Sequence, residues 1–91
     1  MAVSVKIPTP LRRLTNQEST VSAAGGDVAA MIESLEGSFP GIKARLCDND
    51  GELRHFVNIY INGEDIRYID GTSTELSDGD EVSIVPAVAG G

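Results

Sequence analysis

Apolar and polar positions alternate at the start of the chain. One side of residues 2–7 is apolar and carries Val3, Val5 and Ile7. A period of two residues predicts a strand with one buried face, and Pro8 is expected to end it. Residues 11–18 are mostly polar and are predicted to form a turn or short connection, after which residues 20–22 return as a second strand.

A different period begins after the break at Gly25-Gly26. Apolar side chains then recur at spacings of three and four residues, at Val28, Met31, Ile32 and Leu35. This spacing predicts an amphipathic helix, with Asp27 as its N-terminal cap and Gly37 as its C-terminal stop. Residues 42–46 are compatible with one more short turn of helix, and residues 48–51 have the composition of a turn.

Strand patterns return in the second half of the chain. Residues 56–62 form the clearest strand, Asn62-Gly63 is a strong tight-turn signal, and residues 66–69 are predicted as a short partner strand. Residues 81–85 form the last strand. This order predicts an α+β fold, with one main helix on one face of a mixed sheet of about four or five strands. A common closure of such a sheet places the last strand beside the first, in parallel, at the centre.

The alternation also assigns the faces of the sheet. Val57, Ile59 and Ile61 are uniformly aliphatic and should face the helix, so Phe56 and Tyr60 should face outward. Val85 in the last strand should face outward with them. An exposed apolar cluster on a small protein indicates a docking surface, here Phe56, Tyr60, Val85 and the adjoining Pro86. The alternative is that these side chains cover each other or lie under a loop.

Composition and charge narrow the class of protein. The chain has 91 residues, 41% hydrophobic but only 4% aromatic, which predicts one domain with an aliphatic core. Its net charge of -7 disfavours binding to nucleic acid and to anionic membranes. No secretory signal or membrane-spanning stretch is visible, and the single cysteine, Cys47, allows no internal disulfide. The cytoplasm is the expected location.

The usual catalytic constellations are not visible in the sequence. Cys47 is a lone cysteine in a polar turn, and His55 has no nearby metal ligand or nucleophile, so neither is expected to be reactive. Residues 48–52 lack the distal glutamate of a calcium loop. The chain is therefore expected to be neither an enzyme nor a metal site.

The C-terminus carries the most specific signal. After the last strand the chain ends in Pro86-Ala87-Val88-Ala89-Gly90-Gly91, which predicts a domain over residues 1–85 and a flexible tail over 86–91. The tail, the segment 76–82 and the order of elements together resemble the ThiS/MoaD family of sulfur carriers, prokaryotic relatives of ubiquitin. The resemblance covers essentially the whole chain, and the segment 55–67 is most similar to CysO-type carriers of cysteine biosynthesis.

The resemblance implies a ubiquitin-like β-grasp fold and a specific chemistry. A ubiquitin-activator-like enzyme would use ATP to adenylate the Gly91 carboxylate, and a sulfur donor would convert it to a thiocarboxylate. Val88, Ala89 and Gly90 would thread through the active sites of partner enzymes. A PLP-dependent cysteine synthase would accept the sulfur, and a metalloprotease would release cysteine. The carrier is then a monomeric co-substrate with no cofactor of its own.

The residue chemistry of the tail is compatible with this role, and alternatives remain. An α-carboxyl group has a pKa of about 3.5, so the Gly91 carboxylate is ionised and can attack ATP. Glycine has no Cβ, which allows passage through a narrow channel. The alternatives are the small subunit of molybdopterin synthase, a ubiquitin-like modifier joined to lysines of target proteins, and a passive interaction module.

Overall fold

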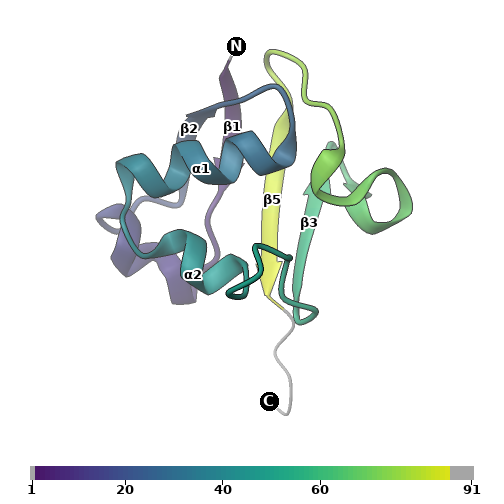
Figure 1. The fold of residues 1–91 in the computed structure, drawn as a ribbon. Helices are drawn as coiled ribbons and strands as arrows, with labels where there is room; N and C mark the ends of the chain where they lie inside the picture. Colours follow the sequence, from purple (N-terminus) through teal and green to yellow (C-terminus); the bar gives the residue numbers. More distant parts are fainter. Residues whose placement is uncertain (1, 87–91) are drawn as a thin grey trace.

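The computed structural model describes residues 2–86 (Figure 1). Its strands are β1 (Ala2–Lys6), β2 (Thr20–Ala24), β3 (Val57–Ile61), β4 (Glu64–Asp65) and β5 (Glu81–Pro86). Its α-helices are α1 (Val28–Ser38) and α2 (Ile42–Leu46). Three short 3-10 helices complete the set, η1 (Thr9–Thr15), η2 (Ile66–Tyr68) and η3 (Gly71–Ser73).

The five strands form one mixed sheet in the order β2-β1-β5-β3-β4. β1 and β5 are parallel neighbours at the centre, and the other pairs are antiparallel. α1 and α2 both lie on one face of this sheet (Figure 1). The α+β class and the parallel pairing of the first and last strands are confirmed, and the fold is the β-grasp fold.

The core lies between the sheet and the helices and is almost entirely aliphatic. Val57, Ile59 and Ile61 are 2%, 0% and 8% exposed, so the predicted inward face of β3 is confirmed. They pack with buried residues of the other two central strands, Val3, Val5, Val82 and Ile84. The strand alternation therefore placed the apolar face correctly wherever a residue belongs to a strand.

α1 begins as predicted but ends later. The Asp27 carboxylate accepts a hydrogen bond from the N–H of Ala30 at 2.8 Å, which satisfies a free donor of the first turn. The prediction that Gly37 stops the helix is wrong, because α1 continues to Ser38 and Phe39 closes it by donating its N–H to the Leu35 carbonyl. The left-handed backbone that favours glycine occurs at Gly41, with φ of 102°.

The connection after β1 is more regular than predicted. Residues 9–15 form η1 in place of the expected irregular turn, with Pro10 in its first turn, where the missing N–H costs nothing. The Thr15 hydroxyl is fully buried and donates to the Glu18 carbonyl at 2.9 Å. A 3-10 helix this short has no clear sequence period, which is why the pattern did not predict it.

The predicted partner strand over residues 66–69 is also wrong. Asn62 and Gly63 have φ of 51° and 92°, so they form the expected two-residue hairpin turn. This turn sets Glu64 and Asp65 directly opposite Ile61 and Tyr60. The chain then leaves the sheet as η2, because Ile66 is buried in the core.

β5 extends one residue further than residues 81–85. Pro86 lies opposite Val57 at the end of the β3–β5 ladder. The Val57 carbonyl, to which an N–H of residue 86 would donate, instead accepts a hydrogen bond from the Arg67 guanidinium at 2.7 Å, so this pair requires no N–H from proline. Pro86 is thus the last described residue, at the end of a central strand.

Candidate functional site

The structure defines the point from which the tail starts. Gly91, the candidate thiocarboxylate site, and the threading residues Val88, Ala89 and Gly90 lie outside the described residues. β1 and β5 run parallel, so Pro86, at the end of β5, lies at the opposite end of the strands from the start of β1 (Figure 1). We call the part of the molecule around Pro86 the tail end and the part around Ala2 the acidic end.

Two of the predicted docking residues share the open face of the sheet, the face without helices. Asn58 pairs with Val85, and Tyr60 pairs with Ser83. Tyr60 and Val85 are therefore diagonal neighbours, a separation that an aromatic side chain can span. Val85 is 43% exposed, so part of the expected apolar cluster is present on this face.

Phe56 lies elsewhere. It precedes β3, so the alternation of the strand does not determine its direction. Its side chain is 39% exposed and lines a groove of about 310 Å³ together with Pro86. The expected single cluster is thus divided between the open face and this groove, and the role of each residue in docking stays a prediction.

We call this hollow the tail-base groove. It lies where η1, α2 and the turn before β3 meet the ends of β3 and β5. Its main lining residues are Leu11, Arg45, Leu46, Arg54, Phe56 and Pro86. The two charged residues among those that line it are both arginines, although the chain has a net charge of -7.

Arg67 holds the turn that forms one wall of the groove. Its guanidinium donates to the carbonyls of Val57 at 2.7 Å, Arg54 at 3.1 Å and His55 at 3.2 Å, and also to Asn58 Oδ1. These bonds bring η2 against the 54–57 turn and fix the backbone that carries Phe56. Arg67 was not singled out from the sequence. The hairpin did offer one indication of its position. Residue 60 pairs with residue 65, and if this pairing is continued along the chain, residue 67 lies opposite residue 58.

The charges are distributed unevenly between the two ends. Arg12 and Arg13 in η1 lie at the tail end with Arg45 and Arg54. The acidic end carries Asp27, Glu75, Asp78, Asp80 and Glu81 in or beside the loops that close the sheet. The turn beside Arg54 also carries Asp48, Asp50 and Glu52, so the positive charge at the tail end is confined to η1 and the lining of the groove.

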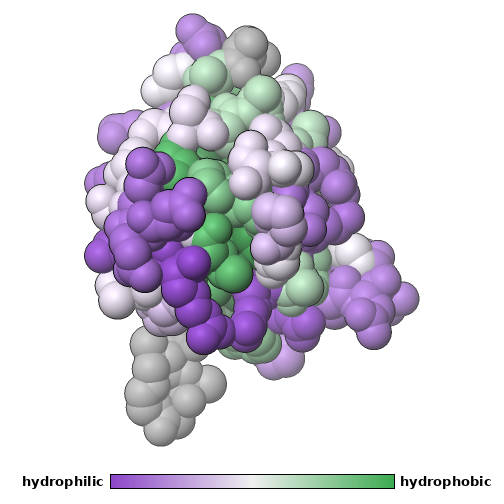
Figure 2. Space-filling model, turned by 90° about the vertical axis from the view of Figure 1, so that its left-hand side faces the viewer, coloured by the Kyte–Doolittle hydropathy of each residue, from purple (hydrophilic) through white to green (hydrophobic). Residues whose placement is uncertain are grey.

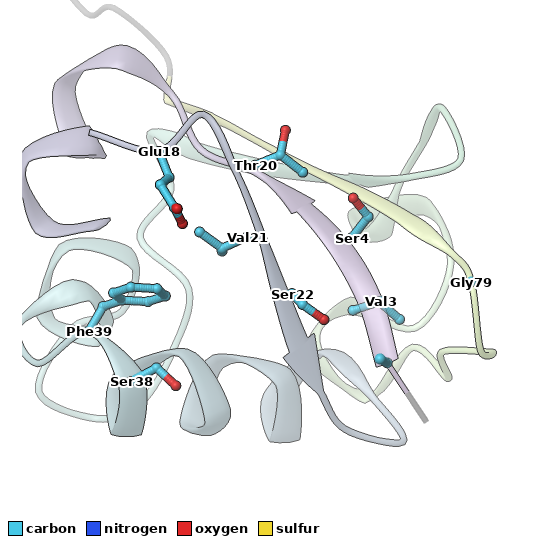
Figure 3. Close-up of a pocket in the computed structure, with 10 residues that line it drawn as sticks. Val3, Ser4, Glu18, Thr20, Val21, Ser22, Ser38, Phe39 and Gly79 are labelled. Carbon is cyan, nitrogen blue, oxygen red and sulfur yellow. The ribbon is translucent and has the colours of Figure 1, made fainter. Parts of the chain in front are cut away.

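A larger hollow, of about 540 Å³, lies at the β2 edge of the sheet. Figure 2 shows apolar side chains in the middle of the face on which β2 lies, with polar ones on both sides. In Figure 3, the side chains of Val21 and Phe39 point toward one another, with Glu18 beside them, while Thr20 points to the other face of the sheet. None of the lining residues belongs to β5 or to the turn before β3, so this hollow is separate from the start of the tail.

The burial of Cys47 agrees with its expected lack of reactivity, whereas the expectation for the exposed His55 stays a prediction. Cys47 is buried, and burial raises the pKa of its thiol, which disfavours the reactive thiolate. The His55 and Phe56 rings are in edge-to-face contact, with their centroids 5.9 Å apart.

Within residues 2–86, no group of three His, Cys, Asp or Glu side chains is arranged to hold a metal ion. No helix in the same range is long and apolar enough to cross a membrane.

Comparison with known proteins decides what kind of protein carries this site. Residues 5–91 match the ThiS family, a span that includes β2 to β5, the end of β1 and the terminal glycines. The chain belongs to the ThiS family. Sulfur carrier protein CysO of Mycobacterium tuberculosis is 50% identical over 93 residues, which cover 100% of both chains. The chain is accordingly a sulfur carrier protein of the CysO type, and not itself a catalyst.

This ThiS family member is also similar to a solved structure and to an archaeal relative. In the crystal structure of the Amycolatopsis orientalis BexX/CysO complex, one chain matches with a TM-score of 0.92 and 46% identity, covering 98% of this chain and 99% of that chain. Small archaeal modifier protein 3 of Haloferax volcanii is 36% identical over 93 residues, with 100% of both chains covered. This chain is therefore similar both to proteins named as sulfur carriers and to a protein named as a modifier.

Proposed function

We propose that this protein carries sulfur as a thiocarboxylate at Gly91 and delivers it for cysteine biosynthesis. The observation that supports this most strongly is 50% identity to a CysO sulfur carrier over the whole chain, together with a C-terminal Gly90-Gly91 that follows shortly after the last strand. The molybdopterin synthase subunit is the less favoured branch of the same chemistry, distinguished by its acceptor enzyme.

The proposed reaction has two steps. In the first, an oxygen of the Gly91 carboxylate attacks the α-phosphorus of ATP, pyrophosphate leaves, and an acyl-adenylate forms. In the second, a sulfide-level donor attacks the acyl carbon, AMP leaves, and the carboxylate oxygen is replaced by sulfur. The carboxylate is ionised at neutral pH, so the first step needs no base to remove a proton from it.

The proposed partners are those that the resemblance to CysO-type carriers implies. A ubiquitin-activator-like enzyme binds ATP and performs both steps, a PLP-dependent cysteine synthase accepts the sulfur, and a metalloprotease releases cysteine. We propose that the carrier acts as a cytoplasmic monomer and uses Tyr60, Val85, Phe56 and Pro86 to dock. The BexX/CysO complex of Amycolatopsis orientalis is a precedent for a homologue bound to another protein.

The test is the intact mass of the untagged protein isolated gently from its native cell. A species heavier by the replacement of one oxygen with sulfur, mapped to Gly91 by fragmentation, is the expected result. A species heavier by one cysteine residue would also identify the branch. Only the unmodified mass, even after incubation with ATP, sulfide and the adenylating enzymes of that cell, would refute the proposal.

A second candidate is a ubiquitin-like modifier, favoured by the full-length identity to a protein named as an archaeal modifier. The same acyl-adenylate would react with a lysine amine in place of sulfide. Conjugates of higher mass in cell extract that disappear when Gly91 is deleted would support this function, and their absence would leave sulfur carriage alone.

A further inference from the structure

We propose that the tail-base groove receives an apolar side chain flanked by carboxylates, presented by the adenylating enzyme beside the entrance to its active site. The inference rests on the proposed function and names the surface by which the carrier is held while its tail is activated. It concerns residues of η1, α2 and the turn before β3, none of which belongs to the open face of the sheet.

The groove lies close to the reacting end of the chain. Pro86 lines it, and only residues 87–91 separate Pro86 from the carboxylate that must react. A fully extended chain spans at most about 3.3–3.6 Å per residue, so these positions reach roughly 17 Å. An enzyme that holds the Gly91 carboxylate at ATP must therefore bring its surface close to the rim of this groove.

The lining of the groove combines apolar and cationic side chains. Leu11, Leu46 and Phe56 provide an apolar surface, and Leu46 is fully buried beneath it. Arg45 and Arg54 provide the charge, and a planar guanidinium binds a carboxylate with two parallel hydrogen bonds. Aromatic and arginine side chains around an apolar pocket are typical of the residues that dominate binding energy at protein interfaces.

The nearby acidic side chains adjoin this groove but do not line it. Glu33, Glu36 and Asp48 line a neighbouring hollow, which shares Ala44 and Arg54 with the groove. The Glu36 carboxylate is already engaged there, because it accepts hydrogen bonds from the backbone N–H groups of Gly41 and Lys43. The groove thus keeps a positive lining in a protein of net charge -7. A partner surface that presents carboxylates to the groove would orient the carrier so that its tail points toward the partner.

Hydrogen bonds hold the groove in place before any partner binds. Arg67 donates to three carbonyls of the turn that carries Phe56, and the Arg54 Nε donates to the Ala44 carbonyl at 3.1 Å. These contacts tie the turn both to η2 and to α2. A surface held in this way loses little conformational entropy on binding.

The experiment measures the dissociation constant between the untagged carrier and the adenylating enzyme of its own cell, together with ATP–pyrophosphate exchange. We expect Arg45→Glu and Phe56→Ala each to raise the dissociation constant at least about tenfold, and to raise the carrier concentration needed for half-maximal exchange in the same proportion. The control is the double variant Ala29→Glu and Ala30→Glu, which changes the net charge equally on exposed positions of the first turn of α1. It should bind as the wild type does.

Added salt gives an independent readout. Wild-type affinity should fall as salt is raised, and the Arg45→Glu variant should lose most of this dependence, because the groove then contributes less attraction. Circular dichroism melting of each variant separates a docking defect from a folding defect. Arg45 is exposed, so its replacement should leave the melting temperature nearly unchanged.

Several results would overturn the inference. Normal binding by Arg45→Glu and Phe56→Ala, with weakened binding by Tyr60→Ala, would assign docking to the open face. Self-association abolished by Arg45→Glu would assign the groove to a second copy. Shifts in the NMR signals of the groove on deletion of residues 87–91, without any binding defect in the groove variants, would assign it to the chain's own tail. If the wild type itself is never adenylated, the proposed function fails first and the inference with it.

Discussion

The two ends of the sheet differ in construction. At the acidic end, aspartate side chains hold the loop before β5. Asp78 accepts a hydrogen bond from the Ala2 N–H at 3.0 Å, and Asp80 accepts one from the Ser77 N–H at 2.8 Å. The tail end has an apolar groove lined by Arg45 and Arg54. Hydrogen bonds also hold the tail end, but there they support an exposed groove, whereas at the acidic end they close the loops of the sheet. Changes at the tail end should therefore reduce activity more than stability, and changes at the acidic end should do the reverse.

The largest expected effect is at the C-terminus itself. Deleting Gly91, or adding one residue after it, should abolish adenylation, because the reacting carboxylate is then displaced or carried by a residue that does not fit. The melting curve should match the wild type. The measurement is ATP–pyrophosphate exchange with the activating enzyme beside circular dichroism, and continued exchange by the deletion variant would refute the tail mechanism.

Gly25→Ala tests the acidic end. Gly25 has φ of 146°, and a Cβ there would lie 2.6 Å from the Met31 backbone nitrogen, so α1 or the turn before it must shift. We expect a loss of about 2–3 kcal/mol in the free energy of unfolding. Urea denaturation measures it, with the open position Gly26→Ala as control. A loss of adenylation by the folded fraction would contradict the division between the two ends.

Tyr60→Ala probes the open face. Tyr60 is partly exposed beside Val85, so its removal should weaken binding to a partner enzyme about tenfold, equivalent to about 1.4 kcal/mol, and alter stability by less than this. Isothermal titration calorimetry and thermal melting provide the two values. Equal losses of binding and of stability would show that the side chain serves the fold.

Asp80→Ala should have a smaller effect on stability. The Asp80 carboxylate accepts from Ser77 N–H and from the Asn62 side chain, and both groups remain close to water. The expected loss is about 1 kcal/mol. Chemical denaturation is the measurement, and an unchanged dissociation constant for the activating enzyme is part of the prediction.

The smallest effect concerns pH. Hydrogen bonds from the backbone N–H groups of Lys43 and Gly41 lower the pKa of Glu36. Because the pKa of Glu36 is lowered in the folded state, its carboxylate adds to the stability of the fold at pH values above the unfolded-state pKa. This added stability is lost as the pH falls through the folded-state pKa. Glu36→Gln should therefore be slightly less stable than the wild type near neutral pH, with the difference vanishing in acid. Melting temperatures across the range from neutral to acidic pH test this, with Glu64→Gln as the control for loss of one charge.

Local sequence patterns predicted most of the fold. The period of two placed Val57, Ile59 and Ile61 in the core, and the period of three to four gave α1 with its Asp27 cap. The Asn62-Gly63 turn was also predicted correctly. These features depend on neighbouring residues, whose steric preferences and hydrogen bonds are the same wherever the segment lies.

The candidate site could be predicted only in part. The terminal Gly90-Gly91 and the family were visible in the sequence, and so was the outward direction of Val85. The separation of Phe56 from Tyr60 was not, because Phe56 lies in a turn where strand alternation no longer applies. η1 was missed as well, since a short 3-10 helix has no clear period of its own.

The order of residues was enough to show which side chains of the strands face the core, where the main helix begins, and that two glycines follow the last strand after a short tail. Only the folded molecule shows that Leu11, Arg45 and Phe56 line one groove beside Pro86, and that Arg67 holds its wall. Periodicity reports the direction of a side chain within one element, whereas a groove depends on how separate elements pack, and that packing is set by the shape of the whole core.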